Sequence, residues 1–149
     1  MRKLWFLMAV VSCHSPIFVE DEIMADVEEM VEADIEEMVK VRSDWDIFIE
    51  ALIQIESGGD SLAVGSKDDV GVLQITPILL IDANRILGYE KYKLNDRYSK
   101  IKSIEIFNII QNYYNEDLDF HFALKVWNSK APLSYHNKVM EKFNRLKTK

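Results

Sequence analysis

Turn-forming residues are scarce in this sequence, which has 5 glycines and 3 prolines among its 149 residues. A β-sandwich or β-barrel needs many tight turns between short strands, and glycine and proline are the residues that form such turns most readily. Long helices need far fewer turns. The sequence therefore predicts a mainly helical fold, and its hydrophobic content of 48% is sufficient for one domain-sized core.

Helical spacing of apolar residues after position 43 predicts five or six helices around one core. The first has an N-cap at Ser43–Asp44 and ends at 57–59; the others cover about 77–87, 101–115 and 120–127, and a last one is capped by Ser134. The polar, aperiodic stretch 58–71 predicts a long loop or a small β-excursion, and 89–99 a charged connection. We expect one domain over residues 43–149.

Residues 1–15 have the layout of a secretory or lipoprotein signal: Arg2 and Lys3 precede an apolar run that ends at Ser12–Cys13. The run is too short to cross a bilayer, which takes about 20 residues. The tetrapeptide 10–13 resembles a lipobox, so Cys13 is a candidate lipidation site and the N-terminus a candidate membrane tether. Export would place the protein in the periplasm or cell envelope. The alternative is an apolar N-terminal segment with a buried thiol.

Residues 16–42 account for the net negative charge of the chain. Positions 20–40 contain ten acidic residues and one lysine, and the net charge of the whole chain is −7. Met24, Val27, Val31, Ile35 and Met38 form an amphipathic stripe, which predicts an acidic helix. Because its charges repel one another, this helix should be marginal alone, and we interpret it as a spacer or, alternatively, as a helix that pairs with a partner.

The remaining domain gives no electrostatic reason to expect nucleic-acid binding, because residues 41–149 have no net charge. The single cysteine excludes an intramolecular disulfide framework, and the three histidines show no metal-ligand spacing. We therefore expect neither a metal nor a nucleic-acid partner.

Glu56 is the most informative residue that spacing alone identifies. Trp45, Ile49, Leu52 and Glu56 are separated by steps of 4, 3 and 4, so Glu56 lies on the apolar side of its helix, in the last turn. Burial and the negative end of the helix dipole both disfavour an ionised carboxylate and raise its pKa, as a proton donor requires. The alternative is a glutamate at the rim of the core with a solvated head.

Three motifs in order resemble the lytic transglycosylase domain of the soluble lytic transglycosylase type, which is related to goose-type lysozymes. They are Glu56–Ser57 followed by Ala63–Val64, then 71–77 (Gly-Val-Leu-Gln-Ile-Thr-Pro), then 123–130 with Trp127–Asn128. A later Tyr135-x-x-Lys-Val element also fits. The resemblance covers residues 45 to about 145 and implies a lysozyme-like helical domain.

The resemblance implies an enzyme that cleaves the bond between N-acetylmuramic acid and N-acetylglucosamine in peptidoglycan, as a monomer without a cofactor. Glu56 would protonate the glycosidic oxygen, and its carboxylate would then take a proton from the C6 hydroxyl, which closes a 1,6-anhydro ring with help from the substrate's N-acetyl group. Ser57 would hold the loop or the Glu56 carboxyl, Gln74 and Trp127 would contact sugar, and Asn128 would fix the loop. Tyr135 is a candidate at the cleft rim.

The sequence departs from the family pattern at three places. Trp127 stands where a tyrosine is usual, Ser129–Lys130 replaces a small Ala-Gly pair, and Gly65 stands where a serine is common. Gln74 and Trp127 are alternatively core residues. Two other functions stay open: Asp60, Asp68 or Asp69 would activate water in a lysozyme-like hydrolase, or the domain would bind cell-wall glycan without cleaving it.

Overall fold

The computed structural model describes residues 27, 30–32, 35 and 44–148. The chain divides into two compact units, Met1–Lys40 and Val41–Lys149, and each is described by itself. In the first unit all of the described positions have helical backbone, as the amphipathic stripe predicts. The signal, the lipidation of Cys13 and the Ser43 half of the first cap lie outside the described residues and stay predictions.

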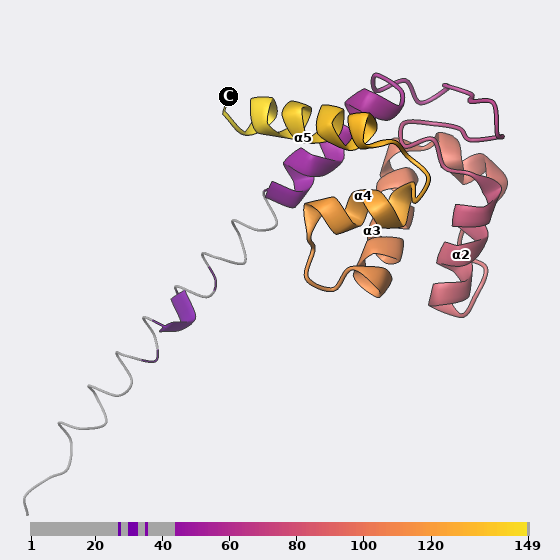
Figure 1. Cartoon of the computed structure of the whole chain (residues 1–149). Helices are drawn as coiled ribbons and strands as arrows, with labels where there is room; N and C mark the ends of the chain where they lie inside the picture. The colour runs from indigo at the N-terminus through magenta and orange to yellow at the C-terminus, as the bar shows by residue number, and fades with distance from the viewer. Residues whose placement is uncertain (1–26, 28–29, 33–34, 36–43, 149) are drawn as a thin grey trace, which may run out of the picture. The chain divides into compact units, whose positions relative to one another are not determined.

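The second unit is mainly helical, as the sequence predicts (Figure 1). A helix over 44–56 is followed by α2 (Pro77–Leu87), the 3-10 helix η1 (Leu94–Tyr98), α3 (Lys100–Tyr114), α4 (Phe120–Trp127) and α5 (Leu133–Lys147). Helices α2 and α4 both contact α3. The predicted stop of the first helix and the predicted bounds of α2 and α4 agree with the structure.

Aromatic side chains join the 44–56 helix to the later helices. Phe48 is fully buried, and its ring lies 5.0 Å from the ring of Phe120 and 6.1 Å from that of Phe143. Trp45 stacks on Phe48 at 5.3 Å, and its indole N–H donates to the Asn108 side chain of α3 at 3.0 Å. Burial of these rings removes a large apolar area from water and fixes the helix that carries Glu56.

The segment between the first helix and α2 has a small β-excursion instead of a plain loop. Val70 forms antiparallel bridges with Val64 and with Ile75. The buried Arg97 of η1 holds this segment, because its guanidinium donates to the backbone oxygens of Asp68 at 2.6 Å and Ile75 at 3.0 Å. The excursion therefore has a fixed position beside the end of the 44–56 helix.

Two local predictions were wrong or incomplete. The N-cap of α5 is Pro132, not Ser134, and α5 begins at Leu133. A proline fixes φ near the value that the start of a helix needs, so the backbone turns into the helix before the serine is reached. The charged connection 89–99 contains η1, a short 3-10 helix that periodicity over so few residues cannot reveal.

Candidate active site

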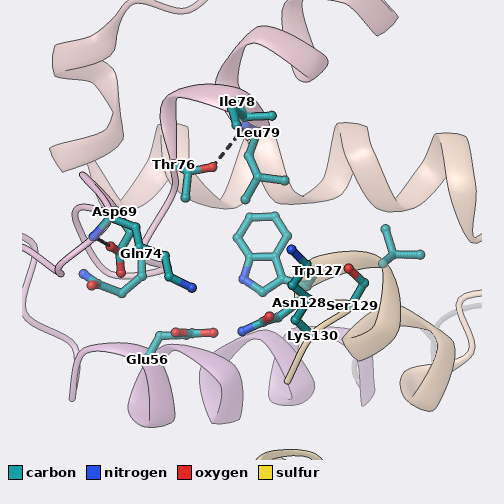
Figure 2. Close-up of a pocket in the computed structure, with 12 residues that line it drawn as sticks. Glu56, Asp69, Gln74, Thr76, Ile78, Leu79, Trp127, Asn128, Ser129 and Lys130 are labelled. Atoms are coloured by element: carbon teal, nitrogen blue, oxygen red, sulfur yellow. Dashed lines mark hydrogen bonds between the residues drawn. The ribbon is translucent and has the colours of Figure 1, made fainter. Parts of the chain in front are cut away.

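A cleft of about 440 Å³ opens at the C-terminal end of the 44–56 helix (Figure 2). Its volume lies in the range of small-molecule pockets, about 300–1,000 Å³. It is lined by Glu56, Lys67, Asp69, Gln74, Thr76, Ile78, Leu79, Val126, Trp127, Asn128, Ser129 and Lys130. Three predicted site residues that are far apart in the sequence, Glu56, Gln74 and Trp127, thus surround one hollow.

The Glu56 side chain comes from the last turn of its helix and is half-buried. Burial raises the pKa of its carboxyl above the ordinary value of 4.5, the negative charge of Asp69 raises it further, and a hydrogen bond from Tyr135 opposes the rise. The Tyr135 hydroxyl donates that bond to Oε1 of Glu56. The rise in pKa expected from the position of Glu56 on the apolar side of its helix is therefore present.

The raised pKa of Glu56 has a consequence for stability that can be measured. The folded chain holds this proton more tightly than the unfolded chain does. The contribution of Glu56 to the free energy of unfolding is therefore complete below pH 4.5 and is lost as the pH rises through the folded-state pKa. We expect the free energy of unfolding of the wild type to fall with pH in this window relative to that of Glu56→Gln. Urea denaturation of both proteins from pH 4 upward gives this difference, and parallel curves would contradict it.

Ser57 ties the end of the helix to the segment before α2. Its hydroxyl donates to the backbone oxygen of Val72 at 2.9 Å and accepts from the N–H of Gly59 at 3.1 Å. Ser57 was expected to hold either the loop or the Glu56 carboxyl, and the structure shows it bonded to the loop. Ser57 does not line the cleft. Its bonds join the end of the helix that carries Glu56 to the 71–77 motif.

Gln74 faces the cleft from a strained position. Its φ of 49° lies in the left-handed region, which a residue other than glycine adopts at some cost. The side-chain amide donates to the backbone oxygens of Gly71 at 2.9 Å and Ala63 at 3.3 Å. The need of this amide for partners is thus met by backbone, and the same bonds orient it along the wall of the cleft.

Trp127 and Asn128 come from the C-terminal end of α4. Trp127 is 7% exposed, and its ring lies edge-on to Phe107 at 4.8 Å, so it both packs in the core and presents part of its surface to the cleft. Asn128 is the C-cap of α4, and its backbone oxygen accepts from the N–H of Ala131 at 3.0 Å. The turn that follows therefore places Ser129 and Lys130 at the edge of the cleft (Figure 2).

Among the three aspartates of the loop, only Asp69 lines the cleft. The Asp60 carboxylate accepts from the N–H of Leu62 at 2.8 Å, and Asp68 is exposed and faces Arg97. Asp69 is folded against the backbone at Gly65, where an added Cβ would lie 2.0 Å from its carboxylate oxygen Oδ2. The glycine that departs from the family pattern therefore makes room for a second carboxylate beside Glu56.

Sequence reasoning did not identify the direct bond between Tyr135 and Glu56, nor Lys67 as a residue of the cleft. Tyr135 is 79 positions from Glu56 in the chain, so no local pattern could join them. Burial raises the pKa of Tyr135, and the adjacent carboxylate raises it further, so its hydroxyl keeps its proton and acts as a donor. Lys67 stands in an aperiodic loop, where spacing carries no signal.

Within the described residues, no three His, Cys, Asp or Glu side chains gather closely enough to hold a metal ion. No helix in the same part of the chain is both long and apolar enough to cross a membrane. Comparisons with protein-family models, with curated proteins and with solved structures found no match.

Proposed function

We propose that this protein cleaves the glycan strands of peptidoglycan between N-acetylmuramic acid and N-acetylglucosamine, as a lytic transglycosylase with a lysozyme-like domain. The observation that carries the proposal is the half-buried carboxyl of Glu56, which has a raised pKa and lines a cleft with Gln74 and Trp127. A carboxyl with a raised pKa keeps its proton to a higher pH and can donate it to a glycosidic oxygen.

One carboxyl is sufficient for both proton transfers of this reaction. Glu56 gives its proton to the leaving oxygen, and the positive charge that develops at the sugar is shared with the substrate's N-acetyl group. The resulting carboxylate takes the proton of the C6 hydroxyl, whose oxygen closes the 1,6-anhydro ring. The Tyr135 hydroxyl supports this cycle, because its hydrogen bond stabilises the carboxylate between the two transfers.

The indole of Trp127 supplies an apolar surface on which a sugar ring can stack. Trp127 has no phenolic hydroxyl to polarise the N-acetyl group, so in this proposal Trp127 positions the sugar while Glu56 carries the proton chemistry. The Asn128 side-chain amide and the Gln74 amide, whose nitrogen already donates to backbone, line the same hollow (Figure 2). The Asn128 amide and the oxygen of Gln74 suit sugar hydroxyl and N-acetyl groups.

Hydrolysis is the second candidate, and the position of Asp69 favours it. A second carboxylate in the cleft could activate a water molecule on the other side of the sugar, as in inverting glycosidases. The Asp69 carboxylate accepts from the N–H of Lys67 at 2.7 Å, a bond that asparagine can also accept. Asp69→Asn therefore removes the base and leaves the loop bonded.

Mass analysis of muropeptides from purified peptidoglycan separates these candidates. We expect the full chain to release 1,6-anhydro-muropeptides, one water lighter than reducing-end products, and we expect Asp69→Asn to release the same products. Reducing-end products that disappear with Asp69→Asn would identify a hydrolase. Glycan binding without any released product would identify a binding module and would overturn the proposal.

A further inference from the structure

Two lysines line the candidate cleft from separate segments. Lys67 belongs to the loop after the first helix. Lys130, labelled in Figure 2, belongs to the turn after α4, where the family that the sequence resembles has a small residue. Both are exposed. Their positions at one cleft come from the fold, because 63 positions of chain separate them in the sequence.

Hydrogen bonds hold the backbone at both lysines. Neither side chain has a salt-bridge partner within residues 44–148. Salt bridges there engage other lysines, such as Lys91, Lys100 and Lys102. The N–H of Lys67 is bonded to the carboxylate of Asp69 at 2.7 Å, and Lys130 lies in the turn closed by the bond from Ala131 to Asn128. Hydrogen bonds thus hold the backbone at the edge of the cleft from which each lysine side chain extends.

The charges of the cleft suit a ligand with a negative group. Lys67 and Lys130 bring two cations to a lining whose carboxyl groups are those of Glu56 and Asp69, and no salt bridge within residues 44–148 engages either lysine. A polymer of neutral N-acetylglucosamine has no charged group to pair with these two ammonium groups. A muramic residue differs from N-acetylglucosamine by its lactyl group, which carries a carboxylate either directly or along its stem peptide.

Resting on the proposed function, we propose that Lys67 and Lys130 bind a carboxylate of the muramic substituent and make the cleft selective for muramyl glycan over neutral N-acetylglucosamine polymers. The lysines act by positioning the strand with a charge-assisted hydrogen bond, and they take no part in proton transfer. Because both side chains are exposed, salt should weaken their contribution.

Binding to the full chain carrying Glu56→Gln tests this without cleavage of the probe. Calorimetric titration uses a chitin hexamer, a glycan with free lactyl carboxylates, and a glycan with intact stem peptides. We expect the added pair Lys67→Ala and Lys130→Ala to weaken binding of at least one carboxylated probe about tenfold, with less than about a twofold change for the hexamer. The affected probe shows which carboxylate is bound.

Lys125→Ala is the matched control, because Lys125 is exposed on α4 but does not line the cleft. It removes one positive charge, half of what the pair removes, and should leave all three affinities unchanged. Equal losses for neutral and carboxylated probes, or no loss for any, would overturn the lysine proposal while wild-type cleavage of peptidoglycan still stands. No glycan binding by Glu56→Gln together with no muropeptides from the wild type would instead overturn the proposed function.

Discussion

Replacement of Glu56 by glutamine is expected to lower the rate of peptidoglycan cleavage by about 10³-fold or more while the fold is kept. General acid–base catalysis contributes typically about 10²–10⁴-fold, and here one group would serve both as acid and as base. Glutamine has nearly the same shape, and its amide oxygen can still accept the bond from Tyr135. Release of muropeptides over time, measured beside thermal unfolding, gives both quantities.

Glu50→Gln is the control for this experiment. Glu50 lies on the same helix, but its carboxylate bonds to Gln54 and pairs with Lys100 outside the cleft. Loss of such an exposed pair lowers the free energy of unfolding by about 0–1 kcal/mol, so Glu50→Gln should stay folded. Because Glu50 lies outside the cleft, this variant should cleave at the wild-type rate. Cleavage that survives in Glu56→Gln would refute the assignment of Glu56 as the acid.

Gly71→Ala is expected to destabilise the folded protein by about 3 kcal/mol. Its φ of +78° costs an alanine about 1 kcal/mol. An added Cβ would also lie 2.0 Å from the backbone oxygen of Arg97, and relief of such overpacking costs about 1–3 kcal/mol more. The midpoint of urea denaturation measures the sum.

Gly88→Ala separates the two causes, because Gly88 has the same φ of +78° but no atom within 4 Å of the added Cβ. It should cost only about 1 kcal/mol. Since Gly71 accepts hydrogen bonds from both the backbone and the side chain of Gln74, Gly71→Ala should also weaken glycan binding. Equal destabilisation by the two substitutions would show that the contact with Arg97 is easily relieved.

The bounds of the helices were predictable where capping and terminating residues close in the sequence set them. Thr76 caps α2 and Gly88 ends it in the left-handed conformation, and Asp119 caps α4, so signals a few residues apart fix these bounds. The start of α5 was missed because Ser134 and Pro132 both carry start signals, and the sequence does not rank them. The helix η1 was missed because five residues give too short a period to read.

The sequence by itself determined the mainly helical class of the fold and the side of its helix on which Glu56 lies. The first follows from the scarcity of turn-forming residues and the helical spacing of apolar residues, and the second from steps of three and four residues along one helix. Only the tertiary structure decided what surrounds that carboxyl. Tyr135, Asp69 and the two cleft lysines come from loops and a helix distant in sequence, and their placement depends on aromatic packing and on the bonds of Arg97 to the β-excursion. Contacts of this kind are non-local, so no periodicity in the chain records them.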